Sequence, residues 1–236
     1  MLKLVREYST KAELVYKTLL DAIVASKLTP GTRLIVREIA DQLSVSDIPV
    51  REALKMLEAT GLIQTRPYIG SVVTTPSPEW IEEVFVMRAA LESMAIRTSI
   101  PFLKDTDVEE LLAIDMAMKS AAEAKNMAEY ARLNREFHTA LMAKSPYPAL
   151  LSTIDDLLVK SQYGRAIFNL KPATVKISDS EHDRLLEAIK VRNGAKAEAI
   201  TRDHRLRVGK ELADIIRARR HVSPEIHERS KRVQIH

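Results

Sequence analysis

Apolar residues return every three or four positions along three stretches in the first quarter of the chain. These stretches are residues 11–26 (KAELVYKTLLDAIVAS), 36–43 (VREIADQL) and 50–61 (VREALKMLEATG), and the spacing predicts a helix over each of them. Two short β-prone runs, LIQTR and SVVTT, lie on either side of PYIG and predict a hairpin with Gly70 near its tip. Three helices followed by a hairpin is the arrangement of a winged helix-turn-helix.

Turn signals separate these elements. TPGTRL contains a Pro-Gly turn, and SVSDIP connects the second and third helices, with Ser46 as the expected N-cap. Gly61 is expected to end the third helix as its C-cap. Pro76 and Pro78, in TTPSPEW, indicate a short linker, so the predicted DNA-binding domain spans residues 1–76.

Past the linker the pattern is helical almost to the end of the chain. Six helices are predicted, at about residues 78–98, 105–124, 126–143, 147–169, 173–192 and 195–220. They indicate an antiparallel helical bundle of six or seven helices over residues 77–221, followed by a flexible polar tail over residues 222–236. The predicted fold is therefore mainly α, with an N-terminal winged helix-turn-helix and a C-terminal antiparallel helical bundle.

Composition narrows the class of protein. The 236 residues include no cysteine, which excludes disulfides and thiolate metal sites, and the net charge of +4 permits nucleic-acid binding without requiring it. No uncharged apolar run approaches the roughly 18 residues of a membrane-spanning helix, and the N-terminal residues lack the apolar core of a signal peptide. We therefore expect a cytoplasmic protein with no membrane partner.

Motifs in both parts of the chain resemble a known family. PGTRLIVREIADQLSVSDIPVREALKMLEATGLIQTRPYIGSVV resembles the DNA-binding domain of GntR-family transcriptional regulators. VFVMRAALESMAIR, LNREFHTAL and EHDRLLEAI resemble the FCD effector domain of the FadR subfamily, so the likeness covers about residues 10–220. The resemblance implies a homodimer that binds a short, near-palindromic operator in double-stranded DNA. It also implies a small carboxylate-type effector that alters DNA affinity and, as in many members, a divalent metal ion.

The outward face of the third helix carries the residues expected to read DNA: Ser46, Asp47, Ile48 and Arg51. Arg51 is the strongest candidate for reading a guanine, because its guanidinium matches the O6 and N7 acceptors of that base. The resemblance also implies DNA-contacting arginines at Arg51 and at Arg37 on the second helix.

Three further residues are expected to meet the DNA beside the recognition helix. Arg33 and Arg66 are candidates for phosphate contacts, and Gly70 would let the backbone of the wing approach the minor groove closely. For each arginine the alternative is an ordinary solvated surface residue. Residues 1–76 carry 10 Lys and Arg against 8 Asp and Glu, so one copy is expected to bind weakly and two copies on a two-fold operator would double the contacts.

Two residues depart from the family pattern. Asp47 stands where a basic residue is common; its carboxylate can gain from the helix dipole, pair with Arg51, or accept a hydrogen bond from a cytosine amino group. Our hypothesis is that Asp47 positions Arg51 and makes operator choice stricter without ending DNA binding. Ser44 replaces a common glycine; a left-handed serine costs about 1 kcal/mol, and the turn is expected to survive.

Four residues of the second part are candidate metal ligands. Asn134 and His138 lie four residues apart on one predicted helix, and His182 and His204 lie on two others. The resemblance implies that they hold a divalent ion, and three imidazoles with one amide oxygen suit Zn²⁺ or Ni²⁺. The alternative for each histidine is an ordinary surface or core residue. Asn134 replaces the more usual Asp, so we expect a weaker and more positive site that favours an anionic effector.

Arg88 is the candidate effector-binding residue, because a guanidinium can hold a carboxylate through two hydrogen bonds. The alternative is an ordinary ion pair with Glu92, four residues on. The leading interpretation of the chain is a ligand-responsive transcriptional regulator of genes for a small carboxylate or sugar acid, and not an enzyme. Two alternatives stay open: a metal-dependent, hydrolase-like helical bundle, and a constitutive DNA-binding protein with a purely structural bundle.

Overall fold

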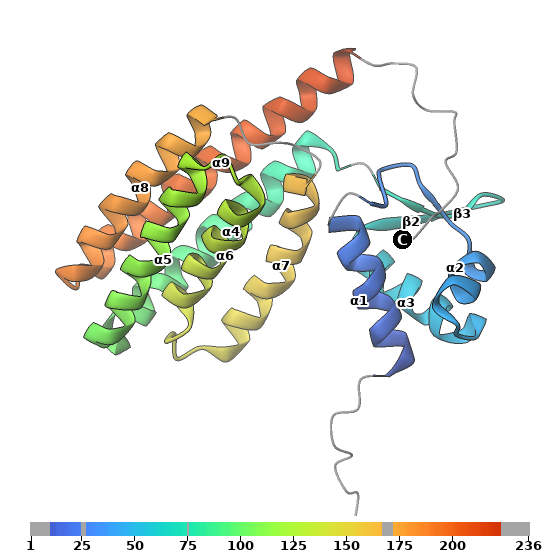
Figure 1. The fold of residues 1–236 in the computed structure, drawn as a ribbon, viewed down its shortest axis with the longest axis horizontal. Coiled ribbons are helices and arrows are strands. Elements are labelled where there is room, and N and C mark those ends of the chain that lie inside the picture. Colours follow the sequence, from blue (N-terminus) through green and yellow to red (C-terminus); the bar gives the residue numbers. More distant parts are fainter. Residues whose placement is uncertain (1–9, 25–26, 75, 167–171, 223–236) are drawn as a thin grey trace, which may run out of the picture. The chain divides into compact units, whose positions relative to one another are not determined.

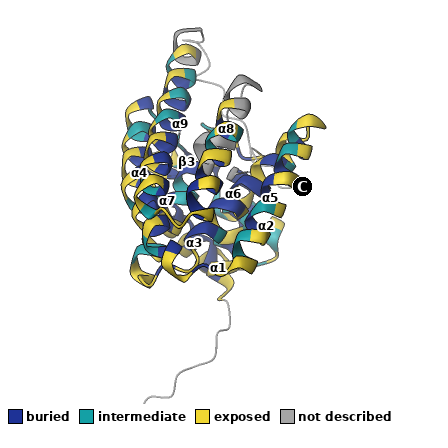
Figure 2. Ribbon diagram, turned by 90° about the vertical axis from the view of Figure 1, so that its left-hand side faces the viewer, coloured by how far each residue is buried: buried dark blue, intermediate teal, exposed yellow. Residues whose placement is uncertain are grey.

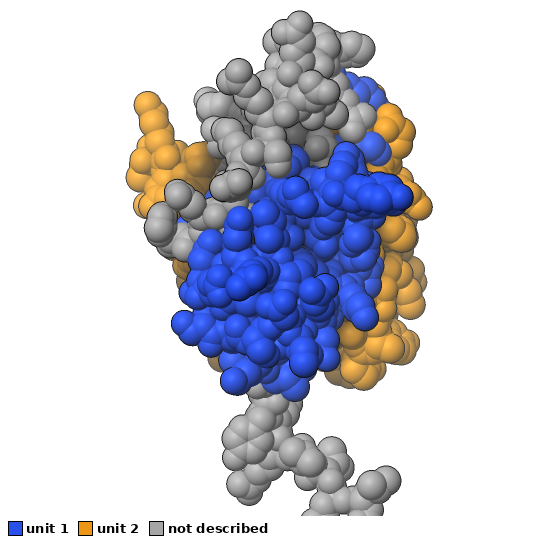
Figure 3. Space-filling model, turned by 90° about the vertical axis from the view of Figure 1, so that its right-hand side faces the viewer, with its two compact units in different colours: residues 1–77, 162–167, 217–236 blue, residues 78–161, 168–216 orange. Residues whose placement is uncertain are grey.

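The computed structural model (Figure 1) describes four stretches of the chain, residues 10–24, 27–74, 76–166 and 172–222. Figure 3 colours its two compact units, of which one comprises residues 1–77, 162–167 and 217–236 and the other residues 78–161 and 168–216. The predicted tail, apart from Val222, lies outside the described residues. The predicted fold class is confirmed, because a winged helix-turn-helix is followed by a bundle of helices.

Three helices build the first unit: α1 (Lys11–Val24), α2 (Val36–Leu43) and α3 (Asp47–Ala59). α1 packs chiefly against α3. Leu19 and Ile23 of α1 and Val50 and Leu57 of α3 are fully buried, so the apolar stripes that predicted these helices form one core. Burying each such side chain contributes about 1.5–3 kcal/mol, which is why the spacing of apolar residues decides where the helices form.

The turn between α2 and α3 is shorter than the sequence predicts. Ser44 adopts the left-handed conformation, with φ 54° and ψ 44°, as expected for the residue that replaces glycine there. α3 begins at Asp47, directly after the predicted N-cap Ser46, although the apolar repeat that predicts this helix starts only at Val50. Ser46 has an extended backbone and makes no side-chain capping bond. Pro49 lies in the first turn, where an N–H has no partner within the helix, so the proline does not delay the helix.

The wing is a three-stranded sheet rather than a bare hairpin. β2 (Ile63–Arg66) and β3 (Gly70–Val73) form the predicted hairpin, and β1 (Arg33–Leu34) pairs antiparallel with the other side of β3. TPGTRL predicts only a turn, because a strand of two residues is too short to show an alternating pattern. Leu34 is nevertheless buried beneath the sheet edge.

Glu58 ties the end of α3 to the wing. Its carboxylate accepts hydrogen bonds from the backbone N–H and the hydroxyl of Thr65 on β2, at 2.8 and 3.0 Å. Gly61 lies one residue beyond the C-cap, which is Thr60 and not Gly61 as predicted. With φ +78°, Gly61 reverses the chain and donates its N–H to the carbonyl of Glu58 at 2.9 Å. α3 and the wing are therefore joined by both side-chain and backbone contacts.

Six α-helices and one 3₁₀ turn make up the described part of the bundle: α4 (Pro78–Ser99), η1 (Ile100–Phe102), α5 (Asp105–Glu123), α6 (Met127–Met142), α7 (Pro148–Ala166), α8 (Pro172–Lys190) and α9 (Gly194–Val222). Every boundary lies within three residues of its prediction. Local caps explain this agreement: Asp107 accepts the N–H of Lys104 at 2.7 Å, and Asn126 accepts that of Glu129 at 3.2 Å. No helix in the described stretches is both long and apolar enough to span a membrane.

The interior of the bundle is not purely apolar. Figure 2 shows buried residues along the inner faces of its helices, and most of them are aliphatic or aromatic. Besides four buried serines and threonines, eight ionisable or amide side chains of the bundle are no more than 6% exposed: Arg88, Glu92, Asp115, Asn134, His138, His182, His204 and Arg205. Buried polar groups cost free energy unless they are paired, so these residues mark a candidate functional site.

Candidate DNA-binding surface and metal site

The predicted reading residues line the N-terminal end of α3 and face outward. Ser46, Asp47, Ile48 and Arg51 are all exposed, and Ile48 keeps 68% of its surface in contact with solvent. An isoleucine so exposed at the start of a recognition helix can contact a thymine methyl group. The first turn also presents backbone N–H groups without partners in the helix, which suit phosphate oxygens.

Asp47 and Arg51 form a loose ion pair on this surface. Arg51 Nη2 lies 3.8 Å from Asp47 Oδ2, too far for a hydrogen bond, and both side chains are more than half exposed. Solvent screens such a pair strongly. The geometry is compatible with the hypothesis that Asp47 positions Arg51. The ion pair is weak enough for bound DNA to replace Asp47 as the partner of Arg51.

Two arginines of the wing lie on either side of Gly70. The sheet pairs Arg66 of β2 directly with Gly70 of β3, and Arg33 lies on β1, the other neighbour of β3. Gly70 has φ +91°, and a methyl group at its Cα would lie 4.0 Å from Arg33 Nε. The wing therefore places Arg33 and Arg66 on the two strands that flank Gly70, whose backbone conformation favours glycine.

Four exposed cations of this unit form no ion pair within the described part of the chain. Arg33, Arg37, Arg66 and Lys55 are exposed, and none forms an ion pair with any residue that the structure describes. Tyr68 at the tip of the wing is fully exposed with φ +62°, a conformation that costs free energy outside glycine. Sequence reasoning missed Tyr68, because a residue in a turn carries no periodic signal.

Three helices of the bundle bring three histidines together. His138 of α6, His182 of α8 and His204 of α9 have ring centroids 5.1 to 5.4 Å apart. One ligand nitrogen from each ring lies within 4.8 Å of the other two. Both ring nitrogens of His138 and of His182, and Nε2 of His204, are buried and have no hydrogen-bond partner among the residues that the structure describes.

The three imidazoles are neutral at physiological pH. Burial lowers the pKa of His138 and of His182 well below the usual value, and nearby positive charge, including Arg205, lowers both further. Burial also lowers the pKa of His204 to about 4, although its hydrogen bond to Glu181 opposes that change. Neutral imidazoles carry the lone pairs that a metal ion requires.

Glu181 fixes the orientation of one ring. It accepts a hydrogen bond from His204 Nδ1 at 2.5 Å, and because a carboxylate cannot donate, the proton of the neutral ring lies on Nδ1 and the lone pair on Nε2. Arg207 holds Glu181 from the other side through Nε and Nη2, at 2.9 and 2.6 Å. Burial raises the pKa of Glu181, but the hydrogen bonds from His204 and Arg207 outweigh it and lower that pKa to about 2.

Asn134 lies on the same side of α6 as His138, one turn earlier. The side chain is 6% exposed and its amide makes no hydrogen bond with a described residue. An amide oxygen is an acceptable ligand for a divalent ion and carries no charge. Asn134 is thus available as a fourth ligand beside the three imidazoles.

The guanidinium of Arg88 is already bonded to other side chains of the bundle. Its Nε donates to Glu92 Oε1 at 2.5 Å and its Nη1 to Ser161 at 2.9 Å, which is the ion pair that the sequence offers as an alternative to effector binding. Arg205 Nε donates to the other oxygen of Glu92 at 2.6 Å. One buried carboxylate therefore serves two buried guanidiniums.

This triad leaves one positive charge uncompensated. Burial raises the pKa of Glu92, but Arg205 and Arg88 more than offset it and hold that pKa below its ordinary value. Burial lowers the pKa of Arg205 to about 10, so the side chain remains charged at neutral pH. Its Nη1 is buried and has no hydrogen-bond partner within the described stretches. Sequence reasoning missed Arg205, because an arginine beside His204 looks like any charged residue on a helix.

Comparison with known proteins now defines the class. Residues 11–73 match the model for bacterial regulatory proteins of the gntR family, and residues 83–207, more than half of the chain, match that of the FCD domain. The chain belongs to the GntR family of transcriptional regulators that carry an FCD domain. These are DNA-binding regulators that respond to a small-molecule effector, and they are not enzymes.

Individual relatives agree with this assignment. The HTH-type transcriptional regulator McbR of Escherichia coli strain K12 is 29% identical over 168 residues, which cover 70% of this chain and 76% of McbR. The HTH-type transcriptional repressor RspR of the same strain is 25% identical over 201 residues, or 85% of this chain and 88% of RspR. The solved structure of Escherichia coli McbR/YncC has a TM-score of 0.75 at 25% identity, covering 88% of this chain and 99% of that one.

Proposed function

We propose that this protein is a homodimeric, cytoplasmic regulator whose affinity for a two-fold DNA operator depends on a small organic anion. The anion, a carboxylate or sugar acid, binds in the bundle beside a divalent metal ion of the Zn²⁺ or Ni²⁺ type. The proposal rests chiefly on the three buried histidines, in which five ring nitrogens have no hydrogen-bond partner in the part of the chain that the structure describes. Each polar group left unpaired in a core costs about 1–3 kcal/mol, so a folded chain that keeps five of them has a partner for them in its working state.

The DNA half of the proposal assigns a role to each exposed residue. Arg51 reads a guanine in the major groove, while Ser46, Ile48 and Asp47 contact the neighbouring base edges. Arg37, Arg33 and Arg66 contact phosphates, and Gly70 lies at the minor groove. Support comes from the exposure of these residues and from the absence of an acidic partner for the three arginines among the described residues.

The metal would be held by His138, His182, His204 and the amide oxygen of Asn134. When bound, the ion supplies a positive charge that attracts a carboxylate. Glu181 accepts a hydrogen bond from the Nδ1–H group of His204, and this bond keeps the lone pair of the ring on Nε2. The hydrogen bonds that Arg207 donates keep Glu181 deprotonated for this task.

The anion is the ligand class that the charges favour. The triad of Arg88, Glu92 and Arg205 carries one net positive charge inside the bundle, and the adjacent imidazoles are neutral. Arg205 Nη1 is a charged donor with no acceptor among the described residues, and a carboxylate oxygen of the effector would supply one. Arg88 keeps its effector role in this proposal through the charge it adds rather than through a free guanidinium.

Regulation follows from linkage between the two sites. An effector that binds more tightly to one of two DNA-binding states of the dimer changes DNA affinity by the ratio of its affinities for those states. Typical coupling of this kind changes affinity by about 5–150-fold.

The test begins with an operator selected by the purified full chain from random duplexes. Fluorescence anisotropy then measures operator affinity with Zn²⁺ or with a chelator, in the presence of small carboxylates and sugar acids. We expect at least about a thousandfold preference over random DNA, and a change of at least about fivefold with one metabolite. The variant H182A should keep operator binding and lose the response, while the exposed control E187A should keep both.

Each contrary result points to a different error. The absence of any sequence preference would remove the DNA half of the proposal. Selective binding that no metal or anion alters would favour the constitutive alternative, in which the bundle is purely structural. Turnover of a metabolite by the metal-loaded protein would favour the hydrolase-like alternative.

A further inference from the structure

The tip of the wing is a tight turn that carries a large side chain without support. Residues 66–69 form this turn, in which the N–H of Ile69 donates to the carbonyl of Arg66 at 3.2 Å. Tyr68 is the third residue of the turn and has φ +62°, a backbone conformation in which glycine or asparagine is usual. Its ring is fully exposed and makes no ring contact or hydrogen bond with a described residue. The tyrosine therefore strains the turn, and no packing within the fold offsets this strain.

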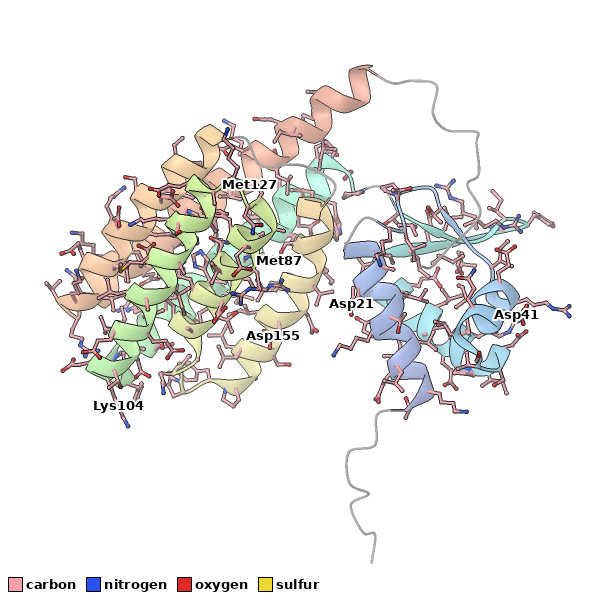
Figure 4. All side chains as sticks on the ribbon, viewed as in Figure 1. Asp21, Asp41, Met87, Lys104, Met127 and Asp155 are labelled. Carbon is pink, nitrogen blue, oxygen red and sulfur yellow. The ribbon has the colours of Figure 1, made fainter. Side chains whose placement is uncertain are left out.

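The residues on either side of Tyr68 are apolar and exposed too. They are Pro67 and Ile69, and Ile69 keeps 44% of its surface in contact with solvent. Figure 4 shows side chains at this end of the hairpin that extend beyond β2 and β3. Arg66 directly precedes these three residues and Arg33 lies on β1, and both arginines are exposed without an ion pair in the described stretches. The wing thus carries an apolar tip, Pro67 to Ile69, next to two exposed cations.

This combination of charge and apolar surface fits the minor groove of DNA. Proteins that bind there combine arginines with inserted apolar side chains, because phosphates border the groove and stacked base pairs form its floor. Insertion of such a side chain between two base pairs partly unstacks them and bends the duplex by about 20–90° toward the major groove. A protein partner would need acidic groups around an aromatic pocket, whereas any stretch of duplex supplies both the charge and the apolar surface.

We propose that Tyr68 is a wedge that enters the minor groove and partly unstacks one base-pair step beside each half-site of the operator. Ile69 packs against the deoxyribose of the opened step, and the nearby arginines hold its phosphates. The inference rests on the proposed function in one respect, which is the location of Gly70 at the minor groove. Pyrimidine–purine steps such as TA unstack most easily, so the wing selects them without hydrogen bonds to their bases.

Selection of operators tests this preference. The full chain and its variant Y68N each select operators from random duplexes, and fluorescence anisotropy measures their affinities. The parent should enrich a pyrimidine–purine step at two symmetric positions that flank the half-sites. Replacement of both steps by the stiffer AA should lower the affinity of the parent about fivefold or more, and that of Y68N by less than about twofold.

Bending and unstacking are measured on the same selected duplex. Energy transfer between dyes at its two ends reports the bend, and permanganate oxidises thymines that have lost a stacking neighbour. The parent should bend the duplex by at least about 20° and make the flanking thymines reactive. Y68N should lose most of both signals, because asparagine accepts the positive φ but has no ring to insert. Y68F should keep both, since the wedge needs the ring and not the hydroxyl.

The controls separate the wedge from folding. Y147N makes the same exchange at Tyr147, which is 48% exposed directly before α7, and it should change neither the bend nor the preferred steps. Thermal unfolding of Y68N should begin at no lower temperature than that of the parent, because asparagine tolerates the positive φ better than tyrosine does. A loss of bending in Y68N is then not a loss of folded protein.

Three outcomes overturn the proposal. If Y68N bends and unstacks the duplex as the parent does, Tyr68 is not a wedge, and a protein partner becomes the candidate occupant of the tip. If the parent binds its operator selectively and responds to metal and anion but leaves the duplex straight and stacked, the wedge fails and the proposed function stands. If the parent prefers no duplex at all, the DNA half of the proposed function fails and the wedge fails with it.

Discussion

The two units of this protein hold their charges in opposite ways. In the winged helix, Arg37 and Arg66 are exposed and pair with no described residue, whereas in the bundle Arg88, Glu92 and Arg205 are at most 2% exposed and share one network. A cation in water costs little to leave unpaired and stays available to replace the counterions of DNA. A buried charge must have its partners in place. Substitution of an exposed arginine in the winged helix should therefore lower DNA affinity and leave the fold intact. Substitution within the buried charge network should instead destabilise the fold of the bundle.

The largest effect is expected from E92Q, which removes the one carboxylate between two buried guanidiniums. The remaining positive charges would lack a counter-charge, so the free energy of unfolding should fall by about 3–5 kcal/mol. Urea unfolding followed by the fluorescence of Trp80, the single tryptophan, measures it. The control E187Q breaks an exposed pair with Lys190 in the same bundle and should change stability by less than about 0.5 kcal/mol. Equal effects of the two variants would contradict the contrast between the units.

The next largest effect is expected from a fall in pH, which should destabilise the bundle and leave the winged helix unchanged. The pKa values of His138, His182 and His204 are lowered in the folded protein. Between pH 6.5 and those lowered values the unfolded chain therefore binds more protons than the folded chain, and the free energy of unfolding decreases as the pH is lowered. Three such groups should cost about 3 kcal/mol between pH 6.5 and 5.5, measured with a chelator present. Residues 1–76 contain no histidine, so hydrogen exchange should show the winged helix unaffected in this window. A bundle whose stability does not change between these pH values would show that the imidazoles are not buried and neutral.

A substitution beside the metal site should act on the ligand more than on the fold. E181Q removes the charge that holds His204 in one tautomer, so metal affinity should fall by about 10–100-fold. Competition with a chelating dye measures this affinity without DNA. E211Q is the matched control, because Glu211 also accepts from Arg207, at 2.8 Å, while the hydrogen bond of His204 Nδ1 goes to Glu181. If E211Q weakens metal binding as much as E181Q does, the effect comes from Arg207 and not from the tautomer.

The smallest effect is expected at the exposed pair on α3. D47R removes a carboxylate from the DNA surface and adds a cation, so affinity for random duplex should rise by about three- to tenfold and operator preference should relax. Gel-shift titration against operator and random duplex measures both quantities. D21R makes the same charge change on the exposed side of α1 and should alter neither by more than about twofold. Unchanged affinity and preference in D47R would count against a role for Asp47 in specificity.

The sequence by itself determined the helices, the hairpin and the exposed face of α3 that is proposed to meet DNA. These features depend on interactions over a few residues: the spacing of apolar side chains, the caps at Asp107 and Asn126, and the left-handed turn at Ser44. The predicted N-cap Ser46 gave the start of α3 correctly, whereas the apolar repeat showed the helix only from Val50, because Pro49 signals a loop but is tolerated at a helix start. β1 was missed because two residues carry no period.

Only the tertiary structure decided which buried polar groups meet. Arg205 and Glu92 are 113 residues apart in the chain, and Glu181 and His204 are 23 apart on separate helices. No local pattern records which helix faces lie together, since each arginine or glutamate reads as a solvated residue on its own helix. Their roles come from the packing of the bundle, which excludes water from them and leaves each with the partners that other helices supply.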